Sequence, residues 1–373
     1  MVLKAKFALG SNRVLTQDGH KTNLQNPPER AMKIKIVCAL MMVLLLQACS
    51  NDEPSTKPTQ KPAFVMTDGY GLMTDDADHL EPIDGITQIL RLSVCDNQLY
   101  VLGKGTQGNL VMWHDGQVRD IDITPAEGTW LSSDSPEVDK GNAYYMYRKG
   151  EFDNGTYFVK GFPNGKTIEL EPLPGASPEI VQFFPISFRV HDEHVYACAA
   201  YTLRYEYPWT TYGSAYVWID GKVVQLSTEP NVTIGSLDGN NGHYVAVGTR
   251  GTTDEGWGIT VYWHDGKLQV LDKRDSDRAQ AIAHMHGYTP ILYGCLRYID
   301  GDNNIDEKAC LWIDGQYVDL SQGRDSDVVG VLSYGDDYYA FVHDYGSINY
   351  HIWKNAQYLK TVTISSIVDC VVY

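Results

Sequence analysis

The stretch that decides the fold is Tyr216-Val217-Trp218-Ile219-Asp220-Gly221-Lys222-Val223-Val224, in which an Asp-Gly pair separates two apolar runs. A two-residue type I′ turn needs positive φ at both central residues, which Asp, Asn and Gly tolerate. The stretch therefore predicts a tight β-hairpin with Trp218 directly opposite Val223. Such an aromatic–apolar pair contributes roughly 0.2–1 kcal/mol more than an alanine pair.

The same phrase returns along the chain with a period of about 40–50 residues. Three further copies keep the Asp-Gly pair after Trp113, Trp263 and Trp312. Weaker copies are Phe162-Pro163-Asn164-Gly165-Lys166, Trp353-Lys354-Asn355-Ala356-Gln357 and Met66-Thr67-Asp68-Gly69-Tyr70. Ala356 replaces the turn glycine, so the sequence predicts a less regular turn there. Seven units, each long enough for several short strands, are typical of a β-propeller.

The two ends of the repeat region complement each other. Residues 63–73 read as the outer hairpin of a unit without inner strands, and residues 364–373 read as an inner strand without its hairpin. Joining them closes a ring and removes exposed strand edges. The sequence thus predicts an all-β propeller of seven four-stranded blades, with a closing blade shared by the N- and C-terminal strands. Six blades with a spare strand at each end is the alternative.

The sequence predicts that the first 62 residues serve in targeting and attachment and are not part of the folded domain. Residues 1–31 show no apolar periodicity and precede Met32, which we interpret as the natural start. Residues 32–48 have a basic start, a short apolar run and small residues before Cys49, as in a secretory signal peptide. The run is shorter than the roughly 20 residues of a membrane-spanning helix. Residues 49–62 predict a polar tether, and residues 63–373 a single propeller domain.

Leu46-Gln47-Ala48-Cys49 resembles the lipobox of bacterial lipoproteins. With the acidic pair behind Cys49 and the Trp-x-Asp-Gly hairpins, residues 32–373 resemble the propeller-repeat surface lipoproteins of Bacteroidetes. The resemblance implies cleavage before Cys49, a lipid on that cysteine and display on the outer membrane at the cell surface. A periplasmic-facing position is the alternative. The resemblance carries no catalytic residues and implies a glycan or protein ligand.

Charge and motifs narrow the function classes. The formal net charge is −17, whereas a nucleic-acid partner requires a basic face, so none is expected. The chain has no Gly-x-Ser-x-Gly elbow, no His-Glu-x-x-His helix and no phosphate-binding glycine loop. These features favour a binding or interaction module. The alternative is a carbohydrate-active hydrolase or lyase that uses carboxylates and arginines at the mouth of the channel.

The candidate ligand site is the longest loop between the second and third strands of any unit. Loops of this class gather on one face of a propeller, around the mouth of its channel. Aromatic side chains there offer flat faces and polar rims that suit sugar rings or a protein partner. The alternative is that they cover the loop itself. The predicted ligand-binding residues are Arg204, Tyr205, Tyr207, Trp209, Arg250 and Trp257, with Arg148, Arg297 and Tyr345 in equivalent loops.

Metal and cysteine patterns are incomplete. Oxygen donors alternate at Asp300, Asp302, Asn304 and Asp306 as in a calcium loop, but the glycine and the final glutamate of that loop are absent. A solvated turn is the alternative, and no other cofactor is expected. The pairs His284/His286 and His191/His194 lack a third ligand.

The five cysteines after Cys49 are odd in number and scattered, which favours buried thiols; one bridge between Cys295 and Cys310 is the alternative.

Overall fold

The computed structural model describes twelve stretches of the chain, all within one compact unit that spans Pro62–Tyr373. They are residues 63–74, 79–95, 97–121, 129–131, 136–150, 156–173, 180–203, 215–229, 232–251, 258–271, 277–299 and 305–372. The described residues form strands, turns and connecting segments. Within these stretches, no helix has the length and apolar character needed to cross a membrane.

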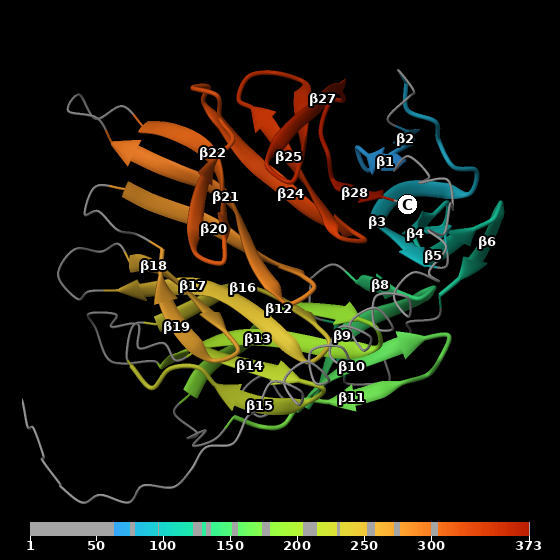
Figure 1. The fold of residues 1–373 in the computed structure, drawn as a ribbon. Helices are drawn as coiled ribbons and strands as arrows, with labels where there is room; N and C mark the ends of the chain where they lie inside the picture. The colour runs from blue at the N-terminus through green and yellow to red at the C-terminus, as the bar shows by residue number, and fades with distance from the viewer. Residues whose placement is uncertain are drawn as a thin grey trace, which may run out of the picture. The chain divides into compact units, whose positions relative to one another are not determined.

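The strands form seven antiparallel sheets that follow one another around a ring (Figure 1). From inner to outer strand, the first three are blade 1, β3(Ile86–Cys95), β4(Gln98–Gly105), β5(Leu110–His114) and β6(Gln117–Asp120); blade 2, β7(Thr129–Leu131) with β8(Glu137–Asp139), β9(Asn142–Lys149), β10(Thr156–Phe162) and β11(Thr167–Glu169); and blade 3, β12(Ile180–His191), β13(His194–Leu203), β14(Ala215–Ile219) and β15(Lys222–Gln225).

The other four sheets complete the ring. They are blade 4, β16(Val232–Asn240), β17(His243–Gly251), β18(Gly258–His264) and β19(Lys267–Val270); blade 5, β20(Asp277–His286), β21(Thr289–Ile299), β22(Ile305–Ile313) and β23(Gln316–Asp319); blade 6, β24(Ser326–Tyr334), β25(Asp337–Asp344), β26(Asn349–Lys354) and β27(Gln357–Thr363); and blade 7, β28(Asp369–Val372), β1(Phe64–Thr67) and β2(Leu72–Thr74).

Blade 7 confirms the predicted closure by both ends of the repeat region. The C-terminal strand β28 pairs antiparallel with β1, from Phe64 opposite Val372 to Thr67 opposite Asp369. The prediction erred on the position of the N-terminal hairpin. Strands β1 and β2 occupy the second and third places of the blade, and Glu81 extends the sheet beyond them through an isolated bridge to Leu72. Seven sheets in one ring exclude the six-bladed alternative.

The Asp-Gly hairpins have the predicted register. Trp218 lies opposite Val223, and the same pairing joins Trp113 to Val118 and Trp312 to Tyr317. Both turn residues have positive φ, as in Asp220 (50°) and Gly221 (84°). These turns join the third and fourth strands of their blades, and we call the rim of the ring that carries them the turn face.

Two weaker copies depart from the pattern. The Asn355-Ala356 turn keeps positive φ, 48° and 61°, so the predicted irregularity is not in the turn. It lies in β27, where the register shifts after Trp353 pairs with Tyr358. The stretch after Met66 is no seventh copy. It joins the second and third strands of its blade, at the opposite rim, and the Asp68 carboxylate accepts hydrogen bonds from the N–H groups of two following residues.

The cores lie between neighbouring blades. In one cluster, Tyr144, Met146 and Val159 of blade 2 pack with Val195 and Trp218 of blade 3. Similar clusters join blades 3 and 4, blades 4 and 5, and blades 5 and 6. The second strands of blades 3 and 4 are therefore apolar on both faces, as the buried runs Val195–Ala199 and Val245–Val247 show. Large faces of every blade are buried only when the ring is complete.

The thiols of blade 5 are not joined. Cys295 is paired with Ala309, so Cys310 points to the other face of the sheet. Cys310 belongs to the core shared with blade 4, whereas the Cys295 thiol lies near Gln280 and Glu307. This alternation excludes the bridge considered from the sequence. Burial is intermediate for Cys95 and complete for the other four, in agreement with the predicted role as small apolar side chains.

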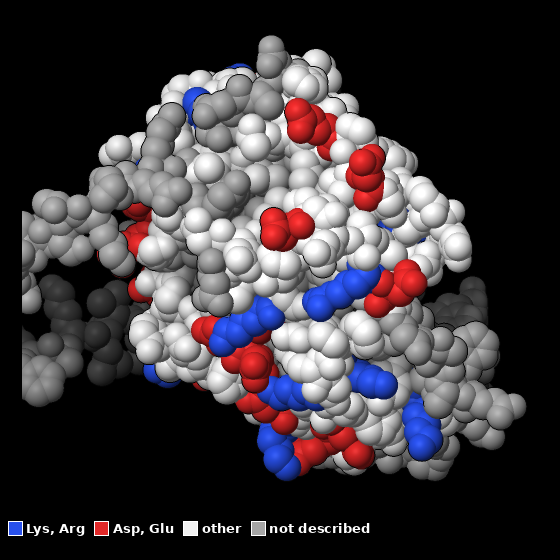
Figure 2. All heavy atoms as spheres, turned by 90° about the vertical axis from the view of Figure 1, so that its right-hand side faces the viewer, with Lys and Arg blue, Asp and Glu red and all other residues white. Residues whose placement is uncertain are grey.

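Charged side chains are mixed on the face of the molecule drawn in Figure 2. In the lower half of this view, Lys and Arg side chains lie beside Asp and Glu side chains. Neighbouring opposite charges of this kind keep a surface hydrated without forming a field of one sign.

Trp218 and Trp263 are a matched pair, each 1% exposed and each in the third strand of its blade. The Trp218 indole donates to the Glu171 carbonyl at 2.8 Å, whereas no described residue accepts from the Trp263 indole. We expect Trp218→Phe to lower the free energy of unfolding by about 1–2 kcal/mol more than Trp263→Phe, because only the first substitution removes a satisfied bond. Urea unfolding of both variants measures the difference. Equal losses would contradict this assignment.

Candidate axial site

The inner strands line a pocket of about 440 Å³ on the axis of the ring. Four of its ionisable residues occupy one structural position, the third residue from the end of the inner strand: Glu137 in β8, Arg189 in β12, Asp238 in β16 and His284 in β20. Ser93 of β3 has the same position. Because inner strands run in the same direction around a propeller, these side chains form one ring near the turn face. We call this cavity the axial pocket.

One side of the axial pocket holds two arginines around one carboxylate. An Arg189 guanidinium nitrogen lies 2.5 Å from the Glu137 carboxylate, and an Arg91 nitrogen lies 3.7 Å from the same oxygen. The nearby negative charge of Glu137 raises the pKa of Arg189 above its ordinary value. The three side chains keep 14–34% of their surface exposed, so they face the cavity as well as one another.

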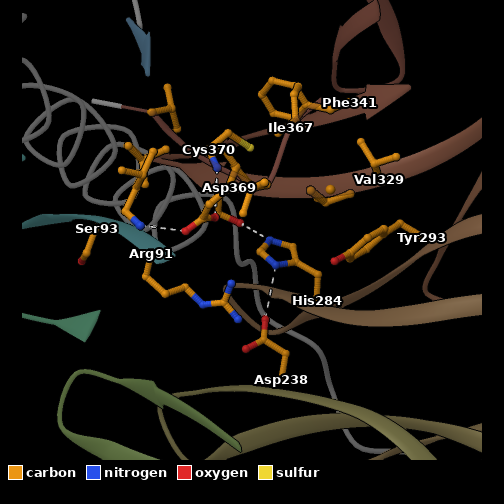
Figure 3. Close-up of a pocket in the computed structure, with 18 of the residues that line it drawn as sticks. Arg91, Ser93, Asp238, His284, Tyr293, Val329, Phe341, Ile367, Asp369 and Cys370 are labelled. Carbon is orange, nitrogen blue, oxygen red and sulfur yellow. Dashed lines mark hydrogen bonds and ion pairs between the residues drawn. The ribbon is translucent and has the colours of Figure 1, made fainter. Parts of the chain in front are cut away.

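The opposite side holds a chain of hydrogen bonds across three blades. The Asp238 carboxylate lies 3.3 Å from Nδ1 of His284, and Nε2 of His284 lies 2.8 Å from the Ser333 hydroxyl. Figure 3 shows the His284 ring between Asp238 and the facing wall. Asp238 also accepts hydrogen bonds from the N–H groups of Gly239 and Met285, at 2.9 and 2.8 Å. These contacts fix the carboxylate and the ring against each other.

The surroundings keep Asp238 ionised. Burial alone would raise the pKa of this carboxyl group. The hydrogen bond and charge of His284 and the charge of Arg189 outweigh that effect, so the pKa lies below its ordinary value. The influence of Arg189 also shows that the arginine side and the histidine side belong to one electrostatic site.

A third carboxyl group, Asp369, enters the axial pocket from the closing strand. It accepts hydrogen bonds from the N–H groups of Leu92 and Cys370, at 2.7 and 2.9 Å. Burial raises its pKa to about 6, although Arg91 and both N–H groups act in the opposite direction. The site therefore contains a carboxyl group that changes charge just below neutral pH.

The raised pKa of Asp369 predicts a pH-dependent stability. The unfolded carboxyl group has an ordinary pKa of 3.8, so between that value and about 6 the folded state binds the proton more tightly. This group then stabilises the fold at low pH, and the contribution, on the order of 1–3 kcal/mol, is lost as pH rises through 6. We expect Asp369→Asn to remove this slope, and urea unfolding at pH 4, 5 and 6.5 measures it. Asp115→Asn, in an exposed turn, is the control; an unchanged Asp369→Asn profile would contradict the prediction.

Of the predicted loop-face residues that the structure describes, Tyr345 lies in a loop as predicted, the three arginines lie in strands, and none lines the axial pocket. Arg148 is buried in β9, and Arg250 of β17 forms an ion pair with Glu229 at 2.7 Å. Arg297 of β21 and Tyr345, just after β25, both contact the carboxylate of Glu307. Arg297 of blade 5 and Tyr345 of blade 6 thus contact the same acidic residue, Glu307 of β22.

Several predicted site residues lie outside the described residues. They are Cys49, Arg204, Tyr205, Tyr207, Trp209, Trp257, Asp300, Asp302 and Asn304. Asp306, the last of the calcium candidates, lies exposed in β22 opposite Tyr298. Within the described stretches, no group of three or more His, Cys, Asp or Glu side chains is arranged to hold a metal ion.

The histidine pairs considered as metal ligands have other partners. His284 and His286 share one face of β20, as predicted, but both contact the Ser333 hydroxyl, at 2.8 and 2.9 Å. His194 contacts the Asp220 carboxylate at 2.7 Å. His191 lies 3.7 Å from Asp192.

The fold and the axial pocket together define the chain as a seven-bladed β-propeller with a polar central site. Neither a protein-family model nor a curated protein matches the sequence. Among solved structures, the chain is similar to the β-propeller domain of the Trilobed protease from Pyrococcus furiosus (12% identity, TM-score 0.43, covering 74% of this chain and 84% of that one). It is also similar to dipeptidyl peptidase 4 of Porphyromonas gingivalis (8%, 0.44, 80% and 49%) and to TolB of Acinetobacter baumannii (10%, 0.30, 76% and 60%). The chain thus spans about half the length of that peptidase.

Proposed function

We propose that the protein is a lipid-anchored binding protein of the cell envelope that takes the polar end of a glycan in its axial pocket. The observation that carries this proposal is the lining of the pocket, where carboxylates, guanidinium groups, an imidazole and a hydroxyl converge from separate blades. A volume of about 440 Å³ lies in the range of small-molecule sites. Paired acids and arginines offer the acceptors and donors that sugar hydroxyls need.

The predicted loop-face residues supply a second contact region in this proposal. A channel has two mouths. Strand β13 ends at Leu203 on the rim opposite the turn face, and the sequence predicts the aromatic loop from Tyr201 to Tyr212 at this point of the chain. A chain of sugars that enters the axis would pass such aromatic side chains, which stack on sugar rings. A protein ligand on the loop face is the alternative outcome of the binding test.

Binding is tested with a glycan array probed by the full chain in detergent, with and without calcium. The pocket variant is Arg189→Ala, and the loop variant combines Tyr205→Ala, Tyr207→Ala and Trp209→Ala. We expect one class of glycan to bind the wild type and to be lost in the pocket variant. Loss in the loop variant alone would place the ligand on the loop face. Absence of any glycan would contradict the proposal and direct the search to outer-membrane proteins.

The proposed anchor rests on the lipobox and has its own test. Growth with an alkyne-tagged fatty acid should label the wild-type protein and not a Cys49→Ala variant. Protease added to intact cells should degrade the protein if it faces outward, whereas protection in intact cells and digestion after lysis would favour the periplasmic-facing alternative.

A second candidate function is a carbohydrate-active hydrolase or lyase at the same site. The polar lining favours it, because Glu137, Asp238 and Asp369 share the cavity with Arg91 and Arg189. Glycoside hydrolysis uses two carboxyl groups, one of them with a raised pKa, and Asp369 has that property. Incubation of array ligands with wild type and Asp369→Asn, with product analysis by mass spectrometry, separates binding from cleavage.

A further inference from the structure

Ser333, His284 and Asp238 have the contacts of a nucleophile, its base and the group that orients the base. They come from the inner strands of three consecutive blades, β24, β20 and β16. The hydroxyl-to-imidazole contact is 2.8 Å and the imidazole-to-carboxylate contact is 3.3 Å, through the two different ring nitrogens of His284. This arrangement is recognised by geometry and role, whatever the fold or the order in the chain.

Exposure distinguishes the proposed nucleophile from its two partners. Ser333 is exposed and lines the axial pocket. The side chains of His284 and Asp238 keep only 17% and 18% of their surface. A substrate can therefore reach the hydroxyl, whereas the histidine and its carboxylate are shielded from bulk water, which strengthens their interaction.

The other hydrogen-bond partners of His284 and His286 show which ring can accept the Ser333 proton. The Asp238 carboxylate and the Asp336 carbonyl, 3.2 Å from Nε2 of His286, can only accept, so His284 carries its proton on Nδ1 and His286 on Nε2. The unprotonated nitrogens, Nε2 of His284 and Nδ1 of His286, then both face the single proton of the Ser333 hydroxyl. Of the two, His284 is backed by a carboxylate that stabilises an imidazolium ion. His284 is the base.

We propose that the axial pocket hydrolyses esters, with Ser333 as nucleophile, His284 as general base and acid, and Asp238 as the group that orients His284. The substrate class is a short acyl group esterified to a polar alcohol such as a sugar hydroxyl. This choice of alcohol rests on the proposed glycan binding. Val329, 38% exposed in the wall of the same cavity, offers an apolar surface for the acyl group.

The reaction balances without a cofactor or redox partner. Ser333 Oγ bonds to the ester carbonyl carbon while its proton passes to Nε2 of His284. That proton moves to the alcohol oxygen as the carbon–oxygen bond breaks, which releases the alcohol and leaves the acyl group on Ser333. A water molecule then gives a proton to His284 and attacks the acyl carbon, and Ser333 leaves with that proton. Ester and water become carboxylic acid and alcohol. Arg91 and Arg189 lie across the pocket from Ser333 and supply positive charge to the same cavity while the carbonyl oxygen becomes negative.

The test uses a fluorophosphonate, which bonds to activated serine hydroxyls, with the full chain in detergent. Intact-protein mass and peptide mapping should show one adduct, on Ser333. We expect none in Ser333→Ala, and adduct formation at least ~100-fold slower in His284→Ala and Asp238→Asn. Hydrolysis of p-nitrophenyl acetate should be lost in parallel. His243→Ala is the matched control, since His243 lies 2.7 Å from Asp265 outside the axial pocket and its loss should leave the rate unchanged.

Each other outcome overturns the assignment. No adduct, an adduct on another residue, or a rate on Ser333 that His284→Ala does not change would contradict it. Equal thermal unfolding midpoints of wild type and Ser333→Ala show that the variant is folded, and Ser333→Thr, which keeps a hydroxyl, should retain a slow adduct. The two proposals can fail separately. Glycan binding without an adduct would support the binding function and contradict the esterase. An adduct on Ser333 without glycan binding would support the esterase and contradict the binding function.

Discussion

A chain that lacks residues 369–373 is expected to lose its cooperative unfolding transition. The deletion removes β28, the inner strand of blade 7, with the buried side chains Cys370 and Val372. Strand β1 loses its ladder partner, and the Leu92 N–H loses the Asp369 carboxylate. Buried apolar side chains at about 1.5–3 kcal/mol each and hydrogen bonds at about 1 kcal/mol each sum to roughly 5–8 kcal/mol. That loss equals the whole stability of many domains.

Circular dichroism and calorimetry measure this loss, and a peptide provides the control. A synthetic peptide of residues 364–373, added in excess, should restore a transition by adding a strand to the open edge of β1. The same peptide with proline at Val371 should not, because proline removes a ladder donor. A truncated chain that unfolds as sharply and at the same temperature as the wild type would show that the ring does not depend on β28.

Removal of the Glu137 carboxylate is expected to have the next largest effect. Its oxygen lies 2.5 Å from Arg189 and 3.7 Å from Arg91, so Glu137→Ala leaves two guanidinium groups close together without a counter-charge. A fully buried pair broken in this way costs about 3–5 kcal/mol. The arginines keep 25% and 34% of their side-chain surface exposed, so we expect about 2–3 kcal/mol from urea unfolding.

Two comparisons separate this effect from general damage. Glu193→Ala removes a surface partner of Lys166 at 3.9 Å, with the glutamate side chain 53% exposed, and should cost less than about 1 kcal/mol. Arg189→Ala added to Glu137→Ala should recover part of the loss, because it removes one of the two uncompensated charges. If Glu137→Ala and Glu193→Ala cost the same, the arginine cluster does not contribute to stability.

Local signals made the blade number predictable. An Asp-Gly pair between apolar runs decides a turn within a few residues, and the tryptophan beside it marks the third strand of a blade. The same locality explains the miscounted copy at Met66, because an Asp-Gly pair looks alike at either rim of the ring. Its place in blade 7 depends on β28, about 300 residues away along the chain.

The axial site could not be predicted in this way. Asp238, His284 and Ser333 stand in three different blades, and nothing near them in the sequence resembles a catalytic motif. Their proximity follows from the ring geometry. One signal was present: Glu137, Arg189, Asp238 and His284 all stand three residues before the turn that follows an inner strand. The aromatic residues that mark the hairpins lie in the outer strands, whereas the ionisable residues of the axial pocket lie in the inner strands.

The closed ring and its axial pocket both depend on the pairing of β1 with β28 in one blade. Met66 lies directly opposite Cys370 in that ladder, at a separation that a disulfide can span. After oxidation, the Met66→Cys variant should give a peptide linked to Cys370, identified by mass spectrometry. The Met73→Cys variant, one strand further out, should not. A linked peptide only in the first variant is the result we predict; no link to Cys370 in Met66→Cys, or an equal link in Met73→Cys, would contradict the closed ring.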